Sequence, residues 1–169
     1  MNKEYRHLLP ADFPDDARVW IYQSSRLFGI GEALEIESML ERFVYDWKSH
    51  GHSVRGFATL FFGRFLVLMA DESSAGVSGC STDSSVRMVK EVEQRFGVSM
   101  FDRQSLAFIV KEKVELLPMG QLSYAMRQGF IGPDTPYFNN LVATKRELMD
   151  GWIVPLRESW LSVRLGVGA

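Results

Sequence analysis

The chain has 169 residues, a formal net charge of −2 at pH 7, three histidines and a single cysteine. This length is enough for one domain that buries a core without disulfides or metals, and one cysteine excludes an internal disulfide framework or a cysteine-based zinc cluster. The near-neutral charge gives no support to nucleic-acid binding. We therefore expect a single globular domain over residues 1–169 that needs no metal and no cofactor.

The sequence shows no segment that predicts export or membrane insertion. Met1–Pro10 is polar and lacks the apolar core of a signal peptide. The apolar run Phe57–Ala70 is interrupted by Gly63 and Arg64 and is too short to cross a bilayer. These features favour a cytoplasmic protein without a membrane partner, whose oligomeric state the sequence leaves open.

The first third of the chain predicts a strand followed by a helix. After an irregular lead-in over residues 1–17, Arg18–Ser24 has the β-branched and aromatic bias of a strand. Glu32–Ser49 predicts the clearest helix, because apolar side chains recur along it at helical spacing. The side chains of this face, which we expect in the core, are Ile36, Met39, Leu40, Phe43, Val44 and Trp47.

The middle of the chain predicts a β-hairpin. Val54–Phe62 and Phe65–Asp71 have the composition of strands, and Gly63 and Arg64 between them fit a two-residue type II′ turn with glycine first. The apolar residues of both strands are nearly continuous rather than alternating. This pattern predicts a sheet that is covered on both faces.

The rest of the chain mixes helices with short strands. A second helix is expected to reach about Phe96, with Ser81, Thr82 or Asp83 as its N-cap. Thr144–Glu147 matches a capping box that opens a last helix, which glycine 151 and proline 155 interrupt. The pattern also predicts strands at 106–110, 114–117 and within 134–142, a short helix at 121–128, and a tail at 166–169. We therefore predict an α+β fold in which a mixed or mostly antiparallel sheet packs with about three main helices.

The cysteine lies in the turn Gly79–Ser85, which follows an apolar strand and opens the second helix. A helix N-terminus lowers the pKa of a nearby thiol, so Cys80 is a candidate nucleophile. No second cysteine gives it a redox partner, and no histidine lies near it in sequence to act as a base. The structural alternative is a buried cysteine that packs at the end of the strand.

The same turn and the segment Ser24–Arg26 together suggest an anion site. If their two strands run in one direction, the turns meet at one edge of the sheet, where N–H groups, hydroxyls and a guanidinium would converge on a carboxylate or phosphate. Asp83 would order the turn, although helix capping alone also explains these polar residues. The ligand-binding candidates are Ser24, Ser25, Arg26, Cys80, Ser81, Asp83 and Ser84.

Two further polar pairs lie near the ends of predicted elements. Asp102 and Arg103 follow the second helix, where a local salt bridge between them would fix a turn; a contribution of Arg103 to an anion site is the alternative. Asn139 and Asn140 fall in or beside a strand, where asparagine is depleted. They fit hydrogen bonds to backbone groups at a bulge or turn better than they fit ligand contacts.

Four pieces of the chain resemble a family of uncharacterised Bacteroidetes proteins, some of which are labelled ABC transporter ATPases. These pieces are Ser78–Val86, Phe101–Arg103, Phe138–Val142 and Glu158–Trp160, and the resemblance covers roughly Arg18–Trp160. It implies no established activity. The ATPase label does not fit the residues, because such an ATPase needs a Gly-rich loop with a lysine for the phosphates, and no GxxxxGK[ST] segment occurs.

The sequence thus predicts, first, a domain that binds a small anionic ligand or a phosphorylated partner. A thiol-dependent enzyme with Cys80 as its nucleophile is the second hypothesis. A third is a protein-interaction module with an exposed aromatic surface in the C-terminal third, although we expect most of its members in the core. The aromatic residues concerned are Tyr137, Phe138, Trp152 and Trp160.

Overall fold

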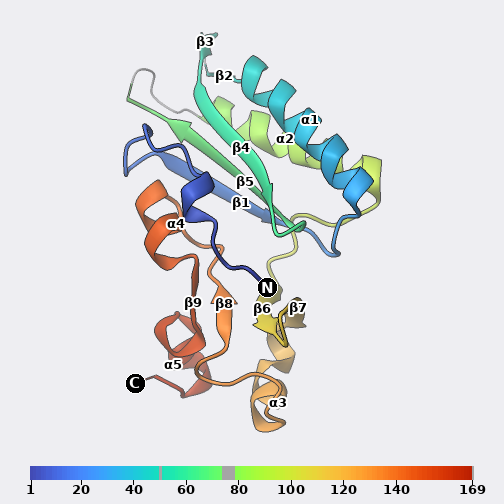
Figure 1. The fold of residues 1–169 in the computed structure, drawn as a ribbon, viewed down its shortest axis with the longest axis vertical. Helices are drawn as coiled ribbons and strands as arrows, with labels where there is room; N and C mark the ends of the chain where they lie inside the picture. Colours follow the sequence, from blue (N-terminus) through green and yellow to red (C-terminus); the bar gives the residue numbers. More distant parts are fainter. Residues whose placement is uncertain (50, 74–78, 169) are drawn as a thin grey trace.

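The computed structural model describes residues 1–49, 51–73 and 79–168, without the side chains of residues 48, 49 and 79–81 (Figure 1). This part of the chain contains two antiparallel sheets, of three and four strands, and a two-stranded hairpin made of β2 (Lys48–Ser49) and β3 (His52–Ser53). The fold is therefore α+β with antiparallel sheets, as the sequence predicts. No helix among the described residues combines the length and the apolar character that crossing a bilayer requires.

The first sheet has the order β1-β5-β4, and each neighbouring pair is antiparallel. Its strands are β1 (Arg18–Gln23), β4 (Arg55–Phe61) and β5 (Phe65–Asp71). The helices α1 (Ile30–Asp46) and α2 (Gly79–Phe96) lie against one face of this sheet (Figure 1). A second core covers the opposite face, so β5 is buried along its whole length. This arrangement confirms the prediction of a sheet covered on both faces.

Alternate residues of β5 belong to these two different cores. Leu66 and Leu68 pack with the apolar faces of α1 and α2, where Ile36 and Leu40 are fully buried. Phe65, Val67 and Met69 point to the other side and pack against the second sheet. The alternation follows from the two-residue period of a strand, which sends successive side chains to opposite faces.

The second sheet has the order β7-β6-β8-β9. Its strands are β6 (Ser105–Val110), β7 (Lys113–Pro118), β8 (Pro136–Phe138) and β9 (Ile153–Pro155). The short helices near it are α3 (Leu122–Arg127), α4 (Lys145–Gly151) and α5 (Leu161–Leu165), with 3-10 turns η1 (Arg6–Leu8), η2 (Met119–Gln121) and η3 (Leu156–Glu158). Within the described residues α1 and α2 are the two long helices. The Thr144 hydroxyl accepts a hydrogen bond from the Glu147 N–H at 3.2 Å, which confirms the predicted cap of α4.

The turn between β4 and β5 differs from the predicted type II′ turn. It has three residues, because Phe61 pairs with Phe65, and the Arg64 N–H donates to the Phe61 carbonyl at 3.0 Å. Phe62 and Gly63 both have positive φ, at 54° and 61°, which is the pattern of a type I′ turn. A phenylalanine tolerates this strained backbone here because its ring packs among aromatic residues of the core between the sheets.

The start of α2 also differs from the prediction. The helix begins at Gly79, so Ser81, Thr82 and Asp83 lie inside its first turns instead of preceding it as N-caps. Ser85 shows how hydroxyl residues are accommodated there: its Oγ donates to the Thr82 carbonyl three residues earlier, at 2.7 Å. Serine and threonine inside a helix commonly bond back to a carbonyl of the preceding turn in this way.

The irregular lead-in over residues 1–17 forms part of the core between the two sheets. Tyr5 is only 1% exposed, and its hydroxyl donates to the Leu148 carbonyl of α4 at 2.6 Å. Leu9, Phe13 and Ala17 are buried in the same core. Because its apolar residues lack a helical or alternating period, the sequence pattern gave no sign that this segment is buried.

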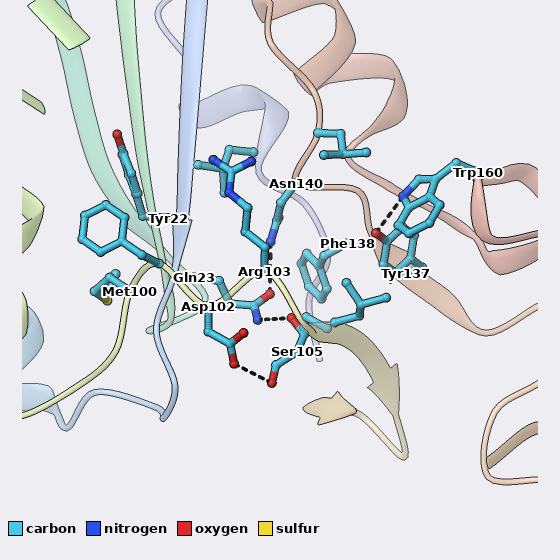
Figure 2. Close-up of a pocket in the computed structure, with 15 residues that line it drawn as sticks. Tyr22, Gln23, Met100, Asp102, Arg103, Ser105, Tyr137, Phe138, Asn140 and Trp160 are labelled. Atoms are coloured by element: carbon cyan, nitrogen blue, oxygen red, sulfur yellow. Dashed lines mark hydrogen bonds between the residues drawn. The ribbon is translucent and has the colours of Figure 1, made fainter. Parts of the chain in front are cut away.

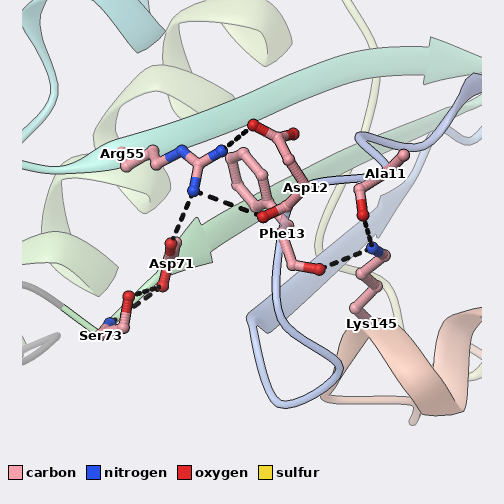
Figure 3. Close-up of polar contacts among 7 residues, drawn as sticks. All are labelled: Ala11, Asp12, Phe13, Arg55, Asp71, Ser73 and Lys145. Carbon is pink, nitrogen blue, oxygen red and sulfur yellow. Dashed lines mark hydrogen bonds and ion pairs between the residues drawn. The ribbon is translucent and has the colours of Figure 1, made fainter.

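Arg55 and Lys145 hold residues 11–13 of the lead-in, as Figure 3 shows. Arg55 of β4 bonds Asp71 at 3.0 Å, forms an ion pair with Asp12 and lies 4.5 Å from the centre of the Phe13 ring. The buried Lys145 donates to the Phe13 carbonyl at 2.7 Å. These contacts fix residues 11–13 against β4 and α4, so the lead-in closes the core from the side opposite the long helices.

Candidate functional site

The two turns predicted to form one anion site lie at opposite ends of α2. Because β1 and β5 are antiparallel, Ser24 follows β1 beside the start of β5, while β5 ends at Asp71, next to the start of β1. Arg26 donates to the Phe96 carbonyl at the C-terminus of α2, at 2.7 Å. An 18-residue helix is about 25 Å long, so Gly79 is far from Arg26. A single small anion cannot contact both turns, and the two-turn site is wrong.

The residues of the first turn serve local contacts. Ser24 is buried, its N–H donates to the Arg64 carbonyl at 2.9 Å, and its hydroxyl accepts from the Arg26 N–H at 3.4 Å. The Ser25 hydroxyl accepts from the Ser99 N–H at 3.0 Å. Arg26 forms a bidentate ion pair with Glu32, with both contacts at 2.8 Å. These bonds tie the end of β1 to the end of α2 and the start of α1.

For the second turn, the structure describes the side chains of residues 82–85. Asp83 is exposed, and the Ser84 hydroxyl accepts a bond from Arg87 at 3.3 Å. The side chains of Cys80 and Ser81 lie outside the described part of the structure. A reactive Cys80 therefore stays a prediction from the sequence.

We expect the Arg26–Glu32 pair to make stability depend on pH. The Arg26 guanidinium and the Gly29 N–H hold the pKa of Glu32 at about 2, below its ordinary 4.5. Stability from a carboxylate with a lowered pKa is present above about pH 4.5 and is lost as the pH falls toward 2. Urea unfolding should show Glu32→Gln less stable than the wild type at pH 6, and the difference should shrink steadily between pH 4.5 and pH 2. A difference that stays constant with pH would contradict this assignment.

A pocket of about 110 Å³ lies where the first sheet meets the second (Figure 2). The end of β1 forms one side, the loop 100–105 before β6 forms the base, and β8 with the following segment forms the other side. Most of the lining is apolar or aromatic. The residues drawn and labelled in Figure 2 are Tyr22, Gln23, Met100, Asp102, Arg103, Ser105, Tyr137, Phe138, Asn140 and Trp160.

A series of hydrogen bonds runs through two side-chain amides in the pocket wall. The direction from donor to acceptor is the same along the whole series. The Trp152 indole N–H donates to Asn140 Oδ1 at 3.0 Å, Asn140 Nδ2 donates to Gln23 Oε1 at 3.1 Å, and Gln23 Nε2 donates to the Ser105 carbonyl at 2.9 Å. Indole N–H is only a donor and a carbonyl oxygen is only an acceptor. The two ends therefore determine which atom of each amide is nitrogen. Each of the two amides has a second N–H, which takes no part in this series of hydrogen bonds.

Asp102 and Arg103 lie next to each other in sequence but extend in opposite directions from the loop (Figure 2). Asp102 accepts from the Gln104 N–H at 2.8 Å and the Ser105 hydroxyl at 2.9 Å. These two hydrogen bonds hold the pKa of Asp102 below its ordinary value. The predicted salt bridge between Asp102 and Arg103 is therefore wrong. Asp102 shapes the turn through local hydrogen bonds.

Arg103 is exposed and makes no hydrogen bond or ion pair with the residues that the structure describes. Its charge is close enough to Tyr22 to lower the pKa of that phenol, although burial outweighs this effect and the pKa of Tyr22 is raised. The Tyr22 hydroxyl is within 3.1 Å of the Ser85 hydroxyl. Arg103 is thus a cation at the edge of a mainly apolar pocket, and no described residue forms a hydrogen bond or ion pair with it.

The opposite side of the pocket is aromatic. Tyr137 is 2% exposed, and burial raises the pKa of its hydroxyl, which accepts a bond from the Trp160 indole N–H at 3.1 Å. Phe138 is buried as well, whereas Trp160 is 40% exposed. With Trp152 also fully buried, three of the four aromatic residues considered for a surface patch are in the core.

Sequence reasoning named some residues of this pocket without placing them together. The sequence makes Arg103 a candidate for an anion site and Asn140 one for a ligand contact, but it predicts Tyr22 and Gln23 only as part of a strand. Asn139 does bond backbone, since its Oδ1 accepts from the Leu141 N–H at 3.4 Å, while the amide of Asn140 bonds side chains instead. No local pattern reports such pairings, because Asn140 and Gln23 are 117 residues apart.

No protein-family model, curated protein or solved structure matches the chain. The resemblance noted from the sequence therefore stays a prediction. The proposal for the function of the protein rests on the geometry of the pocket.

Proposed function

We propose that the protein binds a small organic anion in the pocket between its two sheets, with Arg103 as the counter-charge. The observation that carries this proposal is a guanidinium that lies beside a mainly apolar pocket and has no hydrogen-bond or ion-pair partner in the described part of the chain. An arginine presents a planar set of N–H donors that matches a carboxylate in a bidentate geometry. The remaining N–H groups of Gln23 and Asn140 lie in the same pocket lining and add donors of fixed orientation.

The charges of the pocket favour one negative charge on the ligand. Arg103 supplies a single positive charge, and Asp102 in the same lining already carries a negative one. A second negative charge on the ligand would be repelled by Asp102 without gaining another cation. A carboxylate therefore fits this pocket better than a phosphate monoester. The apolar lining favours an apolar body attached to that carboxylate.

Binding of benzoate and of its neutral counterpart benzamide tests this proposal. Titrations followed by ligand-observed NMR should show that benzoate binds more tightly than benzamide. In Arg103→Gln, the affinity for benzoate should fall about tenfold or more, because a charge-assisted hydrogen bond is lost. Benzamide should be affected much less.

Arg127→Gln is the matched control, because Arg127 is an exposed arginine of α3 outside the pocket lining. This variant should bind benzoate like the wild type. Equal affinities of the wild type for benzoate and benzamide, or an unchanged benzoate affinity in Arg103→Gln, would contradict the proposal.

A further inference from the structure

We infer that the ligand of this pocket is a flat aromatic carboxylate, an inference that rests on the proposed binding of an organic anion beside Arg103. The pocket has aromatic side chains on two sides. On one side the rings of Tyr22 and Phe101 form an edge-to-face pair with centroids 5.5 Å apart. On the other side lie Tyr137 and Trp160 (Figure 2).

The exposure of the aromatic residues indicates where a ligand ring would gain contacts. Phe101 is 38% exposed and Trp160 is 40% exposed, while Tyr22, Tyr137 and Phe138 are buried. The two exposed rings therefore keep apolar surface that the protein itself does not cover. A planar ring placed between the two sides would bury part of both surfaces and would find ring faces and edges to pack against.

The size of the pocket is consistent with one ring. An apolar cavity of about 150 Å³ is known to hold benzene, and the volume of this pocket, about 110 Å³, is of the same order. A saturated six-membered ring is thicker than an aromatic ring and offers no π-face. Hydrogen bonds fix the orientation of the Gln23 and Asn140 amides, which belong to the same lining.

The direction of the carboxylate follows from the positions of the charges. Arg103 lies in the loop 100–105 at the edge of the pocket, and its guanidinium is exposed. The carboxylate would remain partly hydrated there, which keeps the cost of removing its charge from water low. The ring would then extend inward, toward the buried aromatic residues of β1 and β8.

Benzoate and cyclohexanecarboxylate provide the test, since they share the charge and nearly the same size. We expect benzoate to bind roughly two- to tenfold more tightly, the range expected for specific ring contacts. Phe101→Leu and Trp160→Leu each replace an aromatic wall by an apolar one. Each should reduce this preference, while Arg103→Gln should weaken both acids alike. Affinities are measured by the same NMR titrations, and circular dichroism verifies that each variant is folded.

The possible results separate this inference from the proposed function. If both acids bind equally well and both depend on Arg103, the aromatic preference is wrong and anion binding stands. If benzoate is preferred but neither leucine variant changes the preference, the assignment of the aromatic walls is overturned. If neither acid binds, or if binding does not depend on Arg103, both the inference and the proposed function fail.

Discussion

Replacing Trp152 by alanine is expected to lower the free energy of unfolding by about 3–5 kcal/mol, the usual cost of truncating a large aromatic side chain in a core. Trp152 is fully buried between the two sheets. Its ring contacts other aromatic rings at centroid distances of 4.9–5.7 Å, and these belong to Tyr5, Phe61, Phe62, Phe65 and Phe138. The lead-in, both strands of the β4–β5 hairpin and β8 therefore all lose contacts when this ring is removed.

Trp152→Phe separates the packing of this ring from its hydrogen bond. Phenylalanine keeps an aromatic ring but cannot donate to Asn140 Oδ1, so we expect a smaller loss of about 1–3 kcal/mol from the unpaired acceptor and the reduced volume. Urea unfolding followed by circular dichroism measures both variants. Tyr45→Ala serves as the control, because Tyr45 is 89% exposed and its loss should change stability by less than about 0.5 kcal/mol. If Trp152→Ala were as stable as this control, the Trp152 side chain would not stabilise the core as we expect.

Replacing Gly56 by alanine is expected to destabilise the protein by about 1–3 kcal/mol, although only one methyl group is added. A Cβ at this position in β4 would lie 2.5 Å from Cε3 and 2.9 Å from Cζ3 of Trp47. The indole cannot easily move away, because it is 2% exposed and packs against Trp20 and Phe43 at centroid distances of 5.6 and 4.8 Å.

Gly31→Ala is the matched control for Gly56→Ala. A Cβ at Gly31 would have no atom within 4 Å, and this residue lies in the first turn of α1. Its replacement should leave the free energy of unfolding unchanged or raise it slightly, because alanine loses less backbone freedom than glycine. Chemical denaturation of both variants, monitored by tryptophan fluorescence, measures the difference. Equal stabilities for the two variants would mean that Trp47 can be displaced at no cost.

The periodicity of the local sequence is sufficient to predict those parts of the fold that depend on a single segment of the chain. The helical spacing of Ile36 and Leu40 predicts the buried face of α1, and the continuous apolar residues of β5 predict a strand with two covered faces. The hydroxyl of Thr144 predicts a cap because capping geometry involves only the next few residues. These features need no knowledge of distant partners.

Features that depend on distant partners could not be predicted in the same way. The direction of β1 relative to β5 decides where Arg26 lies, and the sequence pattern of either strand is the same in both directions. Phe62 takes a left-handed backbone conformation, which is rare for a phenylalanine. Its side chain packs against rings from distant segments of the chain. The site shows the same limit: Arg103 was a candidate, but nothing in the sequence places it beside Tyr22.

The burial of the lead-in has a consequence for the order in which the chain can fold during synthesis. Tyr5 is synthesised well before its hydrogen-bond partner, the carbonyl of Leu148, which follows 143 residues later. At the usual pace of translation, this delay is on the order of ten seconds. During this time the sheet of β1, β4 and β5 can pair and pack against α1 and α2, but its other face still lacks Phe138, Leu148 and Trp152. Completion of that face must therefore wait until Trp152 has been synthesised and its side chain packs between the two sheets.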